Sequence, residues 1–141
     1  MAIEQVSVFI ENQPGRLLQI LSLLAEEGID LSAYSVAETS DFGILRIIVH
    51  DTDAAVAALK SHGFTAKKTE VLGLLIPNKT GSSVQAVELL SAAGINIEYT
   101  YAFVMPRAEE AFVLLRVEDN APAEQLLRAA GIRTLEHGEI F

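Results

Sequence analysis

The chain has 141 residues, of which 50% are hydrophobic, and its 19 acidic and 10 basic residues give a formal net charge of −9. The apolar content is ample for a packed core, so we expect a globular protein. The negative charge repels phosphate backbones and anionic lipids, which predicts no nucleic-acid and no membrane partner. The sequence has no cysteine, which excludes disulfides, thiolate metal sites and cysteine nucleophiles.

No signal for export or for metal binding is present in the sequence. Residues 1–5 contain no basic segment leading into an apolar one, and no apolar run approaches the roughly 20 residues of a membrane span. We therefore expect a cytoplasmic protein. The histidines His50, His62 and His137 lie far apart and have no metal-site spacing, so we expect neither a metal nor a cofactor.

The first half of the chain predicts the element order β, α, β, β, α, β. Val6–Ile10 is a short β-branched and apolar run that ends in the turn-forming residues 12–15. Apolar residues at three- and four-residue steps from Leu17 to Leu24 predict a helix that ends at Gly28. The other expected elements are strands over Leu31–Val36 and Phe42–Val49, a helix from Asp51 or Thr52 to Gly63 carrying Val56 and Leu59, and a strand over Thr65–Glu70.

The same order then repeats, which is the most informative property of the sequence. Gly15 and Gly81 are 66 residues apart, and so are Gly28 and Gly94. A strand over Leu72–Ile76 precedes a loop and a helix whose inner face we expect to carry Val84, Val87 and Leu90. A fourth helix is predicted to open at Asn120 with Pro122 in its first turn. Each of the four helices ends at a glycine followed by Ile or Phe, the last at Gly131.

A βαββαβ unit of this size usually forms an antiparallel sheet with both helices on one face, the ferredoxin-like arrangement. We therefore predict an α+β protein of two such units, residues 1–70 and 71–141. The strand Phe42–Val49 is apolar on both alternating sets of positions, which indicates that both of its faces are covered. The helix-free face is expected to pack against the second unit or a second chain, and a homodimer is the favoured form.

The loop before the first helix is the strongest candidate for chemistry. It contains Asn12, Pro14 and Gly15, and the N–H groups of Gly15, Arg16 and Leu17 at the helix start suit a carboxylate. The alternative is a plain turn, because Asn, Pro and Gly are the residues that turns use.

The pattern Asn12-Gln13-Pro14-Gly15-Arg16-Leu17 resembles the binding loop of ACT domains, N-x-P-G followed by a leucine. In amino-acid-binding ACT domains an Asn at the start of the second strand, just after Gly-Ile or Gly-Val, completes the site from a neighbouring unit. Asp30 and Asn96 occupy that position here. The resemblance, which covers both repeats, implies that Asn12 works with Asn96, and Asn78 with Asp30, across an interface between units.

The second unit departs from this pattern, since Thr80 replaces Pro14 and Ser82 replaces Arg16. Its loop is either a second pocket or a helix start capped by hydroxyl groups, and we favour the first loop as the site. We expect no catalytic residues. The candidate ligand-binding residues are Asn12, Pro14, Gly15, Arg16, Leu17, Asp30, Asn78, Thr80, Gly81, Ser82 and Asn96.

Three functions are compatible with this sequence. A regulatory protein that binds a free amino acid explains both glycine loops and the Asn and Asp at the second strands. A ferredoxin-like hydrolase would want an Arg in a phosphate loop beside a catalytic Asn, and Arg16 and Asn12 do not have that arrangement. A module that only assembles with other proteins is the third. We favour the regulatory protein, a non-enzyme whose output passes to a separate enzyme or regulator.

Overall fold

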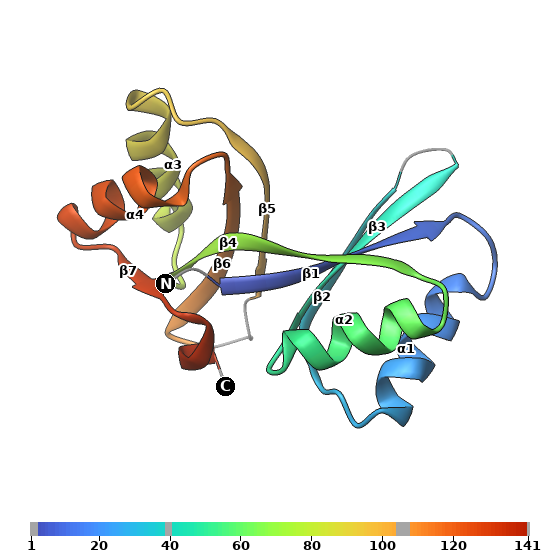
Figure 1. Ribbon diagram of the computed structural model, residues 1–141. Helices are drawn as coiled ribbons and strands as arrows, with labels where there is room; N and C mark the ends of the chain where they lie inside the picture. Colours follow the sequence, from blue (N-terminus) through green and yellow to red (C-terminus); the bar gives the residue numbers. More distant parts are fainter. Residues whose placement is uncertain (1–2, 39–40, 104–107, 141) are drawn as a thin grey trace. The chain divides into compact units, whose positions relative to one another are not determined.

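A computed structural model of the chain describes residues 3–38, 41–103 and 108–140. Within these residues the chain has seven strands, four α-helices and one short 3-10 helix (Figure 1). This confirms the predicted α+β class. The elements are β1 (Ile3–Glu11), α1 (Arg16–Glu26), β2 (Leu31–Glu38), β3 (Phe42–Val49), α2 (Thr52–Ser61), β4 (Thr65–Pro77), α3 (Ser82–Ala92), β5 (Ile97–Phe103), β6 (Glu110–Val117), α4 (Asn120–Ala129), β7 (Arg133–Leu135) and the 3-10 helix His137–Ile140.

The chain divides into two compact units. The first unit is Glu4–Thr69, and the second is Glu70–Ile140 together with Ile3. In the first unit the strand order is β2-β3-β1-β4, and in the second it is β5-β6-β4-β7. The strand pairs β1–β3 and β2–β3 of the first unit, and β4–β6, β4–β7 and β5–β6 of the second, are antiparallel. The two strand orders are therefore those of two ferredoxin-like units.

Each unit has its own core, on the side of the sheet that its two helices cover (Figure 1). Alternate residues of β1 and β3, such as Val8 and Leu45, pack against Ile20 and Leu24 of α1 and Leu59 of α2. In the second unit the corresponding strands are the second half of β4 and β6, and the helices are α3 and α4. Both helices of each unit therefore lie on one face, as predicted.

The junction between the units differs from the expected pair of strands. The sequence predicts one strand over Thr65–Glu70 and another over Leu72–Ile76. β4 is instead one strand of 13 residues, whose first part belongs to the first unit and whose second part belongs to the second. The predicted division at Val71 is wrong, because the extended backbone continues through it.

All four α-helices end in the same backbone motif. The glycine after each helix has a left-handed φ, from 70° at Gly28 to 85° at Gly63. The next residue then donates its N–H back to a leucine carbonyl five residues earlier, as Ile29 does to Leu24 at 2.9 Å and Phe64 does to Leu59 at 3.0 Å. This 6→1 bond defines a Schellman motif, which explains why glycine followed by Ile or Phe recurs. The predicted helix stops are confirmed.

The inner face of α3 was predicted wrongly in part. Leu90 is fully buried as expected, but Val84 and Val87 are 56% and 42% exposed. Ala86 takes the buried place in the helix, because it continues the row that leads to Leu90 four residues later. The helix α4 begins at Asn120, as predicted, and Asp119 is its N-cap, whose side chain accepts the N–H of Ala121 at 3.3 Å.

The helix-free face of β3 is covered only in part within the described chain. Ile48 is fully buried, but Phe42 and Ile44 remain 45% and 37% exposed. The prediction that this strand is covered on both faces is therefore wrong for those two residues within one chain. Cover from a second chain stays a prediction.

Candidate functional site

The loop between β1 and α1 is built on a left-handed glycine. Gly15 has φ 86°, and its counterpart Gly81 before α3 has φ 85°. A Cβ added at either position would meet no atom within 4 Å, so glycine is needed here for its backbone conformation and not for space. The loop therefore turns as the sequence indicates, and no neighbouring atom crowds the Cβ position of its glycine.

Not all of the expected N–H donors at the start of α1 are open. The Arg16 N–H donates to the Gln13 carbonyl at 3.3 Å, so it is already used inside the loop. The N–H groups of Gly15 and Leu17 donate to no backbone carbonyl among the residues that the structure describes. Two of the three predicted backbone donors thus remain for a ligand, as expected where a helix begins.

A small hollow lies beside this loop. Its volume is about 220 Å³, and its walls come from the end of β1, the loop, α1, β2 and β3. Asn12, Arg16 and Leu17 line it, together with Val36 of β2 and Gly43 of β3. Pro14 and Gly15 shape the loop without lining the hollow. The structure thus brings three of the five predicted residues of the first loop to one hollow.

The two loop asparagines tie their loops to the strand pairs in similar ways. The backbone N–H of Asn12 donates to the Asp41 carbonyl at 3.0 Å, and that of Asn78 donates to the Glu109 carbonyl at 2.8 Å. The Asn78 side chain also donates from Nδ2 to the Ala108 carbonyl at 2.8 Å. The amide group of Asn78 therefore has a structural hydrogen bond inside the second unit.

Asp30 and Asn96 lie at the far ends of their own sheets. Asp30 directly precedes β2, whose first residue Leu31 pairs with Val49 at the end of β3. Asn12 follows β1, whose last residue pairs with Phe42 at the start of β3. Asn12 and Asp30 of one unit are therefore at opposite ends of the sheet, and Asn78 and Asn96 are separated in the same way. The pairings of Asn12 with Asn96 and of Asn78 with Asp30 stay predictions.

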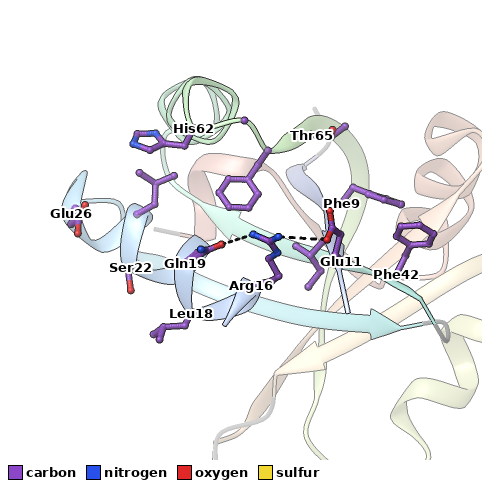
Figure 2. A pocket seen from close by; sticks show the side chains of 14 residues that line it. Phe9, Glu11, Arg16, Leu18, Gln19, Ser22, Glu26, Phe42, His62 and Thr65 are labelled. Atoms are coloured by element: carbon purple, nitrogen blue, oxygen red, sulfur yellow. Dashed lines mark hydrogen bonds and ion pairs between the residues drawn. The ribbon is translucent and has the colours of Figure 1, made fainter. Parts of the chain in front are cut away.

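A second, larger cavity of about 790 Å³ lies in the first unit on the other side of Arg16 (Figure 2). It is an open groove between the end of β1, α1, the end of α2 and the start of β4. Sequence reasoning missed it, apart from Arg16. Its walls include Phe9, Phe42 and Phe64, which are half of the six phenylalanines of the chain. The three aromatic residues are far apart in the sequence, so only the fold shows that they line one groove.

The second unit has a groove at the corresponding place. It has a volume of about 490 Å³ and lies between the end of β4, α3 and the residues between α4 and β7. Thr80, Gly81 and Ser82 line it, so three of the four predicted residues of the second loop meet here, while Asn78 does not line the groove. Leu75 and Ile132 stand where the first groove has Phe9 and Phe64.

In the described part of the chain no three His, Asp or Glu side chains form a group that could hold a metal ion. The most evident ionic contact is structural and lies on the helix side of the first unit. Lys68 Nζ is 2.7 Å from Asp53 Oδ1 and 3.6 Å from Glu4 Oε2. The hydrogen bond to Asp53 and the two negative charges raise the pKa of Lys68 above its usual value.

The comparisons with known proteins agree with this geometry. The family that matches is described as an ACT domain pair, and the match extends over residues 1–135. The chain belongs to the ACT domain pair family. The resemblance inferred from the Asn12 loop is thereby confirmed, and the match accounts for both βαββαβ units. It identifies a module of the regulatory type. None of the curated proteins compared with this chain matches it.

Several solved structures share this fold. A protein from Bacteroides thetaiotaomicron is 38% identical with a TM-score of 0.93, over 99% of this chain and 96% of that one. The regulatory subunit of aspartate kinase from Thermus flavus is 19% identical with a TM-score of 0.66, over 92% and 90%. The regulatory subunit of aspartate kinase from Thermus thermophilus, in a ligand-free form, is 21% identical with a TM-score of 0.63, over 93% and 92%. None of the helices in residues 3–38, 41–103 and 108–140 is long and apolar enough for a membrane span.

Proposed function

We propose that this ACT domain pair binds a free amino acid at the loop between β1 and α1 and acts as a regulatory protein. The observation that carries the proposal is the open pair of N–H groups of Gly15 and Leu17 in this loop, of which Leu17 lines a hollow of about 220 Å³. Backbone N–H groups at a helix start, with the partial positive charge of the helix, favour a carboxylate. The hollow is below the 300 to 1,000 Å³ that is typical of drug-sized ligands, which favours a ligand as small as one amino acid.

The ammonium group of an amino acid needs oxygen acceptors on the opposite side of the ligand. Asn12 lines the hollow and carries an amide oxygen, and Glu11 adds a carboxylate to the same wall. Charge-assisted hydrogen bonds of this kind give both affinity and orientation. The first loop therefore offers groups for both charged ends of the ligand.

The site is proposed to be completed by a neighbouring unit, as the family resemblance implies. Asp30 and Asn96 cannot join the loop of their own unit, because each lies at the far end of its sheet. A homodimer is the favoured assembly. The strands β2 and β5 end the strand order and offer open edges for pairing, and Tyr34 and Val36 of β2 are 52% and 43% exposed. Ligand binding at such an interface would shift how units or chains pack, and a separate enzyme or regulator would respond to that shift.

Calorimetric titration of the full chain with the twenty amino acids tests this proposal. We expect one amino acid, or a chemically related few, to bind, and Asn12→Ala to abolish that binding. Gln125→Ala, on the exposed surface of α4, is the matched control and should bind as the wild type does. If no amino acid binds and none raises the thermal stability of the chain, the proposal is wrong.

A further inference from the structure

The groove of about 790 Å³ in the first unit is separate from the hollow beside the loop (Figure 2). Arg16, Glu11 and Ile10 border both cavities, whereas the other groove walls come from Phe9 of β1, Phe42 of β3, α1, the end of α2 and the start of β4. Its volume lies in the range of sites for drug-sized ligands. The groove therefore has room for a ligand larger than the loop hollow admits.

Arg16 is fixed at the centre of this groove and keeps most of its donors. Its Nη1 donates to Gln19 Oε1 at 3.1 Å, and its Nη2 is 3.6 Å from Glu11 Oε2, beyond hydrogen-bond distance. A guanidinium group has five N–H donors, so most of them have no hydrogen-bond acceptor among the described residues. The side chain is 38% exposed, and in Figure 2 it lies between Gln19 and Glu11. Such an arginine is held in one geometry and still able to bind a carboxylate.

An apolar surface adjoins this cation. Phe9 and Phe42 lie at one end of the groove, with ring centroids 4.9 Å apart, and are 47% and 45% exposed. Phe64, held in place by the Schellman motif at the end of α2, adds a third ring to the walls. Large exposed aromatic side chains beside a pocket are a common mark of a binding surface.

We infer that this groove binds a small carboxylic acid with a bulky apolar group, with the carboxylate on Arg16 and the apolar group on Phe9, Phe42 and Phe64. In a chain of net charge −9, a positioned arginine is needed to attract any anion to this surface. The second unit differs in both parts, since Ser82 replaces Arg16, and Leu75 and Ile132 replace two of the rings. Its groove does include Arg133, but the guanidinium group of Arg133 is 3.4 Å from Glu139 Oε2. The inference does not depend on the loop binding an amino acid.

Nuclear magnetic resonance titration of the full chain with 3-phenylpropionate tests the inference. We expect the amide signal of Gly63, which lines the first groove, to move, and that of Gly131, at the same place in the second unit, to stay. L-phenylalanine carries the same carboxylate and ring with an added ammonium, and binding by either acid at Gly63 supports the inference. The probe that binds more tightly shows whether the natural ligand of the groove is a simple carboxylic acid or an amino acid. Equal binding of 2-phenylethylamine, which has no carboxylate, would overturn it.

Two variants separate the charged and apolar parts of the site. Arg16→Gln should weaken 3-phenylpropionate binding by about tenfold or more, because a hydrogen bond to a charged group is lost. Phe64→Leu should weaken it less, and its folding is checked by the retained amide signals of the first unit, to whose core Phe64 belongs. Gln85→Ala, the counterpart of Gln19 in the second groove, is the matched control. An unchanged affinity of Arg16→Gln for 3-phenylpropionate would overturn the inference. It would also be overturned if the chain self-associates through this groove, so that none of the three probes binds, and if Phe42→Ser abolishes that self-association.

Discussion

The first and second units share their backbone and differ in the side chains at one end. Both have a left-handed glycine before the first helix, an asparagine that anchors the loop to the strand pair, and Schellman motifs after both helices. At the position of Arg16 the second unit has Ser82, and in place of Phe9 and Phe64 it has the aliphatic residues Leu75 and Ile132. The comparison teaches that duplication has preserved what folding requires, while the groups that recognise a ligand are free to differ.

The largest expected effect tests whether the two cores are equivalent. Leu24 in α1 and Leu90 in α3 are at matching positions and are 1% and 0% exposed. Replacing either with alanine should lower the free energy of unfolding by about 2 to 5 kcal/mol, through lost burial and the remaining cavity. Urea unfolding of Leu24→Ala and Leu90→Ala measures this. A loss below about 1 kcal/mol at one of the two positions would break the comparison.

Replacing either loop glycine should lower the stability by the same amount, but the two replacements should differ in their effect on amino-acid binding. Gly15→Ala and Gly81→Ala each place a Cβ in a left-handed conformation, at about 1 to 2 kcal/mol. No atom lies within 4 Å of the added Cβ, so no further clash is expected at either site. Chemical denaturation should therefore give matching values. Calorimetry should show weaker amino-acid binding for Gly15→Ala alone, and an equal loss in Gly81→Ala would indicate two equivalent sites.

The second loop asparagine should be a structural residue. Asn78→Ala removes the 2.8 Å hydrogen bond to the Ala108 carbonyl, which should lower stability by about 1 kcal/mol. The amino-acid affinity of the first loop should stay as in the wild type. Thermal unfolding and calorimetry on the same preparation measure the two effects, and a variant that keeps full stability but loses binding would reverse the roles of the two loops.

The smallest effect concerns Lys68, which has Glu136 at the corresponding place in the second unit. Because the folded-state pKa of Lys68 is raised, its contribution to stability is present below the ordinary lysine pKa of 10.5 and is lost as pH rises through the raised value. Lys68→Met should therefore be slightly less stable than the wild type at neutral pH, with the difference vanishing in strong alkali. The contact is solvent-exposed, which keeps the effect small. A difference that grows with pH would contradict this assignment.

Local sequence signals predicted most of the fold correctly. Gly28 and Gly63 marked helix ends because a left-handed residue there is a local backbone requirement. Val84 and Val87 were placed wrongly because several rotations of α3 offer an apolar stripe, and the packing partner decides among them. The fused strand β4 was missed because adjacent strands in sequence usually belong to one sheet, whereas here one strand serves two units.

The candidate site was less accessible to sequence reasoning than the fold. The Asn12 loop could be recognised because its residues are contiguous in the chain. The groove could not, since Phe9, Phe42 and Phe64 come from three separate elements and meet only through the strand order β3-β1-β4. The hydrogen bond from the Arg16 N–H to the Gln13 carbonyl could not be predicted either, because it depends on the conformation of the loop.

The central claim is that the first loop, and not the second, binds a free amino acid. An amide-resolved nuclear magnetic resonance titration of the full chain with each of the twenty amino acids tests it most directly. The account predicts that one of them moves the signals of Gly15 and Leu17, whose N–H groups are open, and leaves that of Gly81 in place. Movement centred on Gly81, or no movement at either loop with any amino acid, would contradict it.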